Sequence, residues 1–336
     1  MSKRTRLALF AVLAVGCVAV AVIAVVSGAQ KSGDPATKAS AGAGKALTTA
    51  RVDNRQMVLY RALGTGQAKD VSDMDLTPVA GPEKTVTRSG LACARVYFAG
   101  GRGLCVARGH GLTSTFQADI FGPDLKVART IGLTGIPSRA RVSPDGRYGA
   151  VTMFVAGHAY ATPGSFSTQT TLINLATGSK IADLEDFTVS NGGRQVTAVD
   201  VNFWGVTFAR DSDRFYATLA TGGKTYLIQG SVSEKTAHVI HTNVECPSLS
   251  PDGTRIAYKK RTGPKSAPWR LTILDLKTMR ETPLAETRSV DDQVEWLDDG
   301  HVLYGVDGAV WTVPADGTGQ PRRFLAGAES PAVVRW

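Results

Sequence analysis

Short runs of apolar residues, separated by compact turns, recur along most of the chain. The two clearest copies are residues 141–148, RVSPDGRY, and residues 247–256, PSLSPDGTRI, and each leads into a second apolar run. In both, proline stands at the second turn position, where its fixed φ suits a type I turn, and glycine stands at the fourth, where a positive φ costs little. Weaker copies lie at residues 206–215, 294–302 and 96–104. The pattern predicts β-hairpins, and the aspartates in their turns are interpreted as structural.

The spacing of these turns is typical of a β-propeller. Equivalent turn positions are separated by 45, 66, 41 and 47 residues. They fall at Gly100, Asp145, Asp211, Asp252 and Asp299. Four-stranded propeller blades repeat about every 40–50 residues. The one long interval is expected to hold two insertions, one over residues 156–170 and one after Asp186.

The two ends of the repeating region indicate a closed ring. Residues 330–336 have the pattern of a first blade strand with no blade after it, whereas residues 56–61 have the pattern of a second strand. Residues 71–76 and 84–87 follow as the third and fourth strands. If the two ends complete one blade, the ring holds six blades, and closure leaves no exposed sheet edge to template aggregation. The sequence therefore predicts an all-β fold, a six-bladed β-propeller of four-stranded antiparallel blades, closed by pairing of the C-terminal strand with the N-terminal blade.

The Ser-Pro-Asp-Gly turn, followed by an apolar strand and then a strand that ends in Asp-Leu, resembles the repeat of TolB-like β-propellers, a WD40-like family. The resemblance covers residues 50–336 and is strongest over 139–154 and 246–325. The layout is similar to TolB-like proteins of actinobacteria, which are generally membrane-anchored, outward-facing and of unassigned activity. The resemblance to TolB implies a partner protein involved in translocation. TolB also carries an α/β domain before its propeller, and in this chain we expect only a linker at that position.

The N-terminal region predicts a membrane anchor. Residues 7–26 form an unbroken apolar run of 20 residues, which as a helix spans about 30 Å, the thickness of a bilayer core. Lys3, Arg4 and Arg6 precede this run, and positive flanks stay on the cytoplasmic side. We therefore expect a cytoplasmic segment at 1–6, one transmembrane helix at 7–26, and the propeller on the extracytoplasmic side of the cell membrane.

Two alternatives for this region remain open. Cleavage after a signal peptide, near Ala29, would release the chain, and Cys17 stands in a sequence that loosely resembles a lipoprotein box. Residues 27–46 are rich in Ser, Gly, Ala and Lys and show no apolar period. This composition predicts a flexible, solvated linker before a propeller domain at 47–336.

Charge and motifs limit the classes of function. The net charge is +9, of which residues 1–45, with six basic residues and Asp34, hold +5. The rest is spread along the chain, unlike the concentrated basic face of a nucleic-acid reader. A Gly-x-Ser-x-Gly nucleophile elbow and metal-ligand histidine spacings are both absent from the sequence. We therefore expect no nucleic-acid partner, no cofactor, no metal and no enzymatic activity.

Cysteine placement suggests one disulfide. Cys93 and Cys105 are expected to flank the hairpin of the second blade, on its first two strands, close enough to bridge. Cys246 falls across the ring and is left over. Outside the cytoplasm such a bond forms readily, and two buried thiols are the alternative.

Propellers commonly bind ligands where the loops entering the first strand and linking the second to the third surround the channel. Those loops give the candidates Arg139, Asn202, Trp204, Glu245, Asp292 and Gln293, and the first insertion adds His158, Tyr160 and Phe166. Each can instead be a solvated loop residue, or, for Trp204, part of the blade packing.

These observations favour a protein-binding or scaffold module at the cell envelope. The alternative is a sensor that binds a small molecule or glycan at the channel mouth, and an enzyme is the third class. A deep polar pocket would favour the sensor, and a flat face with exposed aromatic residues would favour the protein partner.

Overall fold

The structure is a computed structural model that describes residues 35–64, 71–109, 115–155 and 167–336. Several predictions concern residues outside these ranges, namely 1–6, 7–26, Cys17, Ala29, His158, Tyr160 and Phe166. Within the described ranges, no helix is both long and apolar enough to span a bilayer.

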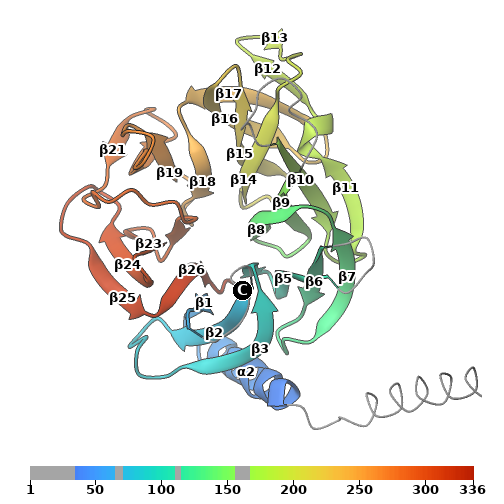
Figure 1. The fold of residues 1–336 in the computed structure, drawn as a ribbon, viewed down its shortest axis with the longest axis vertical. Helices are drawn as coiled ribbons and strands as arrows, with labels where there is room; N and C mark the ends of the chain where they lie inside the picture. Colours follow the sequence, from blue (N-terminus) through green and yellow to red (C-terminus); the bar gives the residue numbers. More distant parts are fainter. Residues whose placement is uncertain (1–34, 65–70, 110–114, 156–166) are drawn as a thin grey trace, which may run out of the picture. The chain divides into compact units, whose positions relative to one another are not determined.

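The described strands form six sheets around a common centre, so the predicted six-bladed propeller is confirmed (Figure 1). Blade 2 contains β4 (Arg95–Ala99), β5 (Arg102–Arg108), β6 (Phe116–Phe121) and β7 (Val127–Leu133). Blade 3 contains β8 (Ile136–Val142), β9 (Tyr148–Val155), β10 (Ser167–Asn174) and β11 (Ser179–Asp183). Blade 5 contains β18 (Glu245–Leu249), β19 (Arg255–Arg261), β20 (Trp269–Asp275) and β21 (Glu281–Pro283). Blade 6 contains β22 (Glu295–Trp296), β23 (His301–Val306), β24 (Ala309–Pro314) and β25 (Arg322–Ala326).

Blade 1 closes the ring as predicted. It contains β1 (Met57–Ala62), β2 (Ser72–Pro78), β3 (Thr87–Cys93) and, from the other end of the chain, β26 (Ala328–Val333). β26 pairs antiparallel with β1, with Val58 opposite Val333. Val58, Leu303, Val310 and Val333 share one buried cluster, which joins blade 1 to blade 6. Burial of each such side chain stabilises the closed ring by about 1.5–3 kcal/mol.

The Ser-Pro-Asp-Gly turns confirm the structural interpretation of their aspartates. Asp145 Oδ1 accepts hydrogen bonds from Ser143 Oγ at 2.7 Å and from the Arg147 amide at 2.9 Å. Gly146 has φ +70°, a conformation that glycine adopts without strain. These contacts lower the pKa of Asp145 although its partial burial opposes them, so the carboxylate is held ionised as part of the turn.

Blade 4 carries the second predicted insertion. Its four blade strands are β14 (Asn202–Phe208), β15 (Arg214–Thr221), β16 (Lys224–Ser231) and β17 (Thr236–Thr242). After the short helix η1 (Leu184–Asp186), β12 (Thr188–Asn191) pairs in parallel with β17, and β13 (Arg194–Gln195) extends it. The insertion therefore widens the outer edge of blade 4 to a six-stranded sheet.

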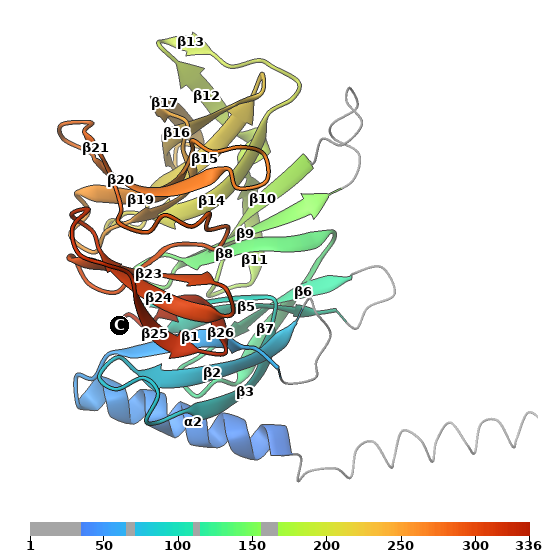
Figure 2. The same cartoon turned by 60° about the vertical axis from the view of Figure 1, so that its left-hand side comes forward.

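The prediction of a flexible linker is wrong for residues 35–46, because these residues belong to helix α2 (Pro35–Val52). Ala43, Leu47 and Ala50 recur at helical spacing and are fully buried in the same cluster as Leu125. A side chain at Gly44 would lie 2.7 Å from the Asp124 carbonyl oxygen, so glycine permits the close packing of helix and propeller. Figure 2 shows α2 beside β2 and β3. Alanine is the strongest helix former. Because its side chain is small, an alanine-rich helix can bury one face without a pattern of large apolar residues.

The predicted Cys93–Cys105 disulfide is present, with 5.5 Å between the two Cα atoms. Its position differs from the prediction, because Cys93 ends β3, the outer strand of blade 1, and does not lie on the first strand of blade 2. The bond therefore connects two neighbouring blades. Among the described cysteines, Cys246 is the free one, and it is buried.

Candidate functional site at the channel mouth

The innermost strand of each blade lines a central channel. In Figure 1 the strands nearest the centre include β8, β14, β18 and β26. Each chain segment enters its blade at one end of the channel, here called the mouth, and the turn after the innermost strand lies at the opposite end, here called the turn end. The mouth and the turn end therefore carry different loops and different chemistry.

A cavity of about 630 Å³ opens at the mouth and is here called the mouth pocket. Its walls come from blades 2 to 5 and from the segment entering blade 6, and they include Arg95, Arg139, Trp204, Glu245, Lys259 and Trp269. The lining holds five basic side chains, including Lys224 and Arg261, against the two carboxylates of Glu245 and Asp291. The pocket is therefore basic, and its aromatic walls are apolar.

Both carboxylates already have cationic partners. Glu245 Oε1 lies 2.8 Å from Arg261 Nη2, and Asp291 Oδ1 lies 2.6 Å from Lys259 Nζ. The Lys259 ammonium also lies 4.1 Å from the centroid of the Trp269 ring, within cation–π range. These pairs neutralise two of the basic groups in place.

Arg95 and Arg139 differ from the other cations because backbone carbonyls are their hydrogen-bond acceptors. Arg95 Nε and Arg139 Nη1 donate to the same oxygen, Ser138 O, at 2.6 and 2.8 Å. Arg95 Nη1 also donates to Ala94 O, and Arg139 Nη2 to Asp291 O. Burial, and next the charge of Arg139, lower the pKa of Arg95 to about 10.

Burial lowers the pKa of Arg139 as well, but the Cys246 thiol and the Asp292 and Asp291 carboxylates outweigh it and raise the pKa. Arg139 therefore stays charged while only 7% exposed. Its nearest ion-pair contact is long, at 4.0 Å from Asp291 Oδ1.

Three of the sequence-predicted residues, Arg139, Trp204 and Glu245, line the mouth pocket. The other described candidates serve the framework. Asn202 Oδ1 accepts from the Thr168 amide at 2.8 Å and so joins blades 3 and 4. Asp292 accepts from Gly305 N, Ser330 N and Ser330 Oγ at 2.9–3.0 Å, between blades 6 and 1.

Gln293 lies beside Arg141 in the channel. With its amide oxygen turned toward the guanidinium, it accepts from Arg141 Nε and Nη2 at 2.6 and 2.8 Å. Gln293 therefore supports the channel wall below the pocket.

Sequence reasoning missed several pocket residues, namely Arg95, Lys259, Arg261, Trp269 and Asp291. Arg95 was missed because the first strand of blade 2 begins after Cys93, not at it. Lys259 and Arg261 end β19, and Trp269 begins β20 directly opposite Arg261. The sequence signal for these residues was the pair of basic side chains, Lys259 and Arg261, which lie across one hairpin from Trp269.

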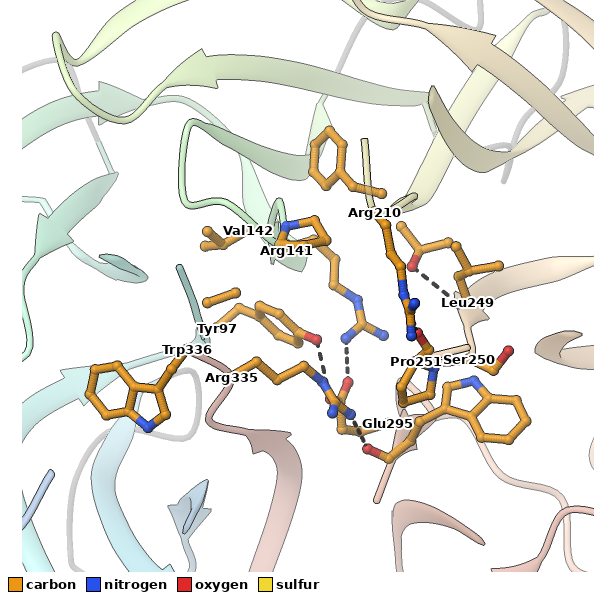
Figure 3. A pocket seen from close by; sticks show the side chains of 15 residues that line it. Tyr97, Arg141, Val142, Arg210, Leu249, Ser250, Pro251, Glu295, Arg335 and Trp336 are labelled. Atoms are coloured by element: carbon orange, nitrogen blue, oxygen red, sulfur yellow. Dashed lines mark hydrogen bonds and ion pairs between the residues drawn. The ribbon is translucent and has the colours of Figure 1, made fainter. Parts of the chain in front are cut away.

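The middle of the channel holds a buried polar network (Figure 3). Arg141 forms an ion pair with Glu295, and both side chains are at most 4% exposed. Tyr97 Oη donates to Glu295 Oε1 at 3.1 Å, and Arg335 Nη2 lies 3.4 Å from the same oxygen. Arg141 Nη2 further donates to Ser248 Oγ at 2.8 Å. Blades 2, 3 and 6 and the C-terminal segment therefore meet at one carboxylate, and Arg141 extends the network to blade 5.

This network raises the pKa of Tyr97, first through burial and then through the negative charge of Glu295. For Arg141, burial lowers the pKa, but Tyr97 and Glu295 outweigh it and raise the pKa. Tyr97 thus donates as a neutral phenol and Arg141 remains a cation.

A smaller cavity of about 200 Å³ lies at the turn end and is lined in part by the same network (Figure 3). Arg210 reaches it from blade 4, but its Nε already donates to Pro251 O at 2.8 Å. The turn-end cavity is therefore small, and the polar groups that line it are already engaged in hydrogen bonds or ion pairs within the protein. Among the described residues, no group of three His, Cys, Asp or Glu side chains can hold a metal ion.

Comparison with known proteins supports the fold. TolB from Acinetobacter baumannii matches with a TM-score of 0.59 at 13% identity, over 86% of this chain and 70% of that chain. A chain of a nidogen/laminin complex matches with a TM-score of 0.53 at 9% identity, over 83% of this chain and 98% of that chain. Putative TolB from Agrobacterium tumefaciens gives 0.49 at 11% identity, over 82% and 91%.

No protein-family model matches the sequence, and neither does any curated protein. Identities this low establish architecture and not activity. With six blades closed by the C-terminal strand and a TolB among its structural neighbours, the chain has the fold of a TolB-like β-propeller.

Proposed function

We propose that this chain is a membrane-anchored binding protein whose propeller, on the extracytoplasmic side of the cell envelope, receives a protein partner on the mouth face. Residues 7–26 supply the anchor. Cleavage near Ala29 or lipidation at Cys17 would change the attachment and not the binding face. The Cys93–Cys105 disulfide supports an oxidising compartment. The proposal includes no catalytic step and no cofactor.

One observation carries the proposal, which is that loops of the mouth face present exposed apolar side chains beside the basic mouth pocket. Ile136 begins β8 and is 64% exposed, and Phe154 stands opposite it at the end of β9. Val199, in the loop entering β14, is 96% exposed. Leu63 follows β1, and its amide donates to Gly327 O just before β26. Apolar groups around a charged centre are the usual composition of a protein-binding surface.

A small-molecule sensor remains the second candidate because of one specific observation. The mouth pocket, at about 630 Å³, falls within the range of ligand pockets, roughly 300–1,000 Å³. A protein partner that covers the mouth face and a ligand inside the pocket are compatible, so the two candidates need separate tests.

The protein-partner proposal is tested by photocrosslinking in cells from two matched positions. A benzophenone amino acid replaces Ile136, on the mouth face, or Val127, which begins β7 at the turn end and is 46% exposed. We expect a discrete protein adduct from position 136 and none from position 127. Identical adducts from both positions, or none from position 136, would contradict the proposed binding face.

A further inference from the structure

The mouth pocket holds two buried cations whose closest acceptors are neutral. Arg95 and Arg139 share the single carbonyl oxygen of Ser138, which brings two positive groups together. Where an arginine is buried for structural reasons, a carboxylate normally accompanies it, as Glu295 accompanies Arg141 in the channel centre. An arrangement of this kind is stabilised by an anion placed between the two guanidinium groups.

Two donors in the pocket walls support the same conclusion independently. Arg139 Nε and Trp269 Nε1 are buried and have no hydrogen-bond acceptor among the described residues. Buried donors are nearly always satisfied, and one that is not marks a place where a ligand or water supplies the acceptor. Both belong to residues that line this one cavity.

The balance of cationic and anionic side chains in the pocket lining indicates which anion would bind. Lys259 and Arg261 are neutralised by Asp291 and Glu245, which leaves the Arg95–Arg139 pair and Lys224 as the surplus in the lining. The two carboxylates in the wall repel a multiply charged ligand more strongly than a monoanion. The planar guanidinium fork matches the two oxygens of a carboxylate.

The remaining residues of the pocket wall indicate what group is attached to the carboxylate of the ligand. Phe154, Trp204 and Trp269 contribute aromatic surface, and Ala220 a small apolar one. The cavity of about 630 Å³ exceeds what a bare carboxylate ion needs. An apolar or aromatic group attached to the carboxylate would fill it.

We infer that the mouth pocket is a binding site for a small organic acid, with its carboxylate between Arg95 and Arg139 and its apolar body against Trp204 and Trp269. The site needs no protein partner, so it is independent of the partner-binding proposal; it rests on the second candidate, the small-molecule sensor, and names the class of ligand. Lys259 and Arg261, each held by a carboxylate, shape the wall.

The test uses the full chain, purified in mild detergent, and titrates it with 3-phenylpropanoate and 4-phenylbutanoate. The matched amides, 3-phenylpropanamide and 4-phenylbutanamide, have the same shape without the charge, and inorganic phosphate represents a multiply charged anion. Calorimetry measures affinity, and intrinsic fluorescence of the five tryptophans, which include Trp204 and Trp269, gives a second readout of binding. We expect the acids to bind at least about tenfold more tightly than their amides and than phosphate.

Substitution locates the site. Arg139→Gln and Arg95→Gln are each expected to weaken binding of the acids at least about tenfold. Arg129→Gln serves as the control, because Arg129 also donates to a backbone carbonyl but lies on the outer strand β7. It is expected to bind as the wild type does. Circular dichroism checks that each variant is folded.

Three results would overturn the inference: equal binding of acids and amides, tighter binding of phosphate, or no acid binding at millimolar concentration. Unchanged affinity in folded Arg139→Gln and Arg95→Gln would do the same. The acid–amide comparison needs only the wild type, so it decides the question even if a variant fails to fold. Crosslinking from position 136 is a separate readout, so either proposal can fail alone.

Discussion

Arg139 and Arg141 stand two residues apart on β8, at the mouth and in the centre of the same channel, and their surroundings differ. Both are buried, at 7% and 4% exposure. Arg141 forms an ion pair with the Glu295 carboxylate, whereas Arg139 donates to the backbone oxygens of Ser138 and Asp291. In the centre a carboxylate is in direct contact with the guanidinium of Arg141, whereas at the mouth the nearest ion-pair contact of Arg139, with Asp291 Oδ1, is 4.0 Å long.

This difference separates a structural use of buried charge from a binding use. The centre joins the blades through one carboxylate, so changes there should lower stability. At the mouth, Arg95 and Arg139 are held through backbone carbonyl groups, so changes to these two arginines should alter binding and leave stability almost intact. Each prediction below tests one side of that division, beginning with the largest expected effect.

Glu295→Gln should be the most damaging single change in the channel. It removes the charge that Arg141 and Arg335 share and leaves the buried Arg141 and the partly buried Arg335 without it. Breaking a buried ion pair from one side costs about 3–5 kcal/mol. Urea denaturation measures the loss of unfolding free energy, with Glu329→Gln, whose carboxylate is more exposed, as the control. A loss below 1 kcal/mol would show that the centre does not hold the ring together.

Neighbouring aspartates at the mouth allow a sharper comparison. Asp292→Ala removes a carboxylate that accepts from Gly305 N, Ser330 N and Ser330 Oγ, and should cost about 2–3 kcal/mol. Asp291→Asn removes a 70% exposed carboxylate paired with Lys259 but keeps an acceptor oxygen for that ammonium, so it should cost less than Asp292→Ala. Thermal unfolding of the two variants in parallel checks this order. The reverse order would contradict the assignment of Asp292 to the framework.

Glu185 provides a partly buried carboxyl that forms no ion pair with a described residue, in contrast to Glu295. Burial raises its pKa to about 8, and it accepts from the Thr170 amide. In the unfolded chain a glutamate ionises near pH 4.3. Between these values the unfolded state binds fewer protons than the folded state, so stability falls as pH rises.

The corresponding variant, Glu185→Gln, keeps a side-chain oxygen that can accept from the Thr170 amide but has no group that ionises. It should match the wild type at pH 4 and be more stable at pH 8, by at most about 5 kcal/mol. Unfolding free energies measured across this pH range test the effect. A parallel pH dependence in wild type and variant would show that Glu185 is ionised in the folded protein.

The sequence predicted the fold well because its signals are local. Each Ser-Pro-Asp-Gly turn encodes its own hairpin, and the spacing of the turns sets the blade repeat. The orphan strands at the two ends predicted closure, which β26 and β1 confirm. Helix α2 was missed because Ala43 and Ala50 bury against the propeller without forming a pattern of large apolar residues.

The site was predicted only in part because a single residue decides where a side chain points. In an extended segment, successive side chains face opposite sides. Loop position alone therefore favoured Asp292, whereas the neighbouring Asp291 faces the pocket. Lys259 and Trp269 come from the second and third strands of blade 5, and their approach to β8 depends on packing between blades, which the spacing of turns does not encode.

The central claim, that the channel centre maintains the fold while the mouth is available for binding, is tested most directly by one pair of variants. Urea denaturation of Arg139→Gln and Arg141→Gln compares two arginines on the same strand with the same substitution. The account predicts that Arg141→Gln loses at least about 3 kcal/mol of unfolding free energy, while Arg139→Gln stays within about 1 kcal/mol of the wild type. Equal losses, or a greater loss for Arg139→Gln, would contradict it.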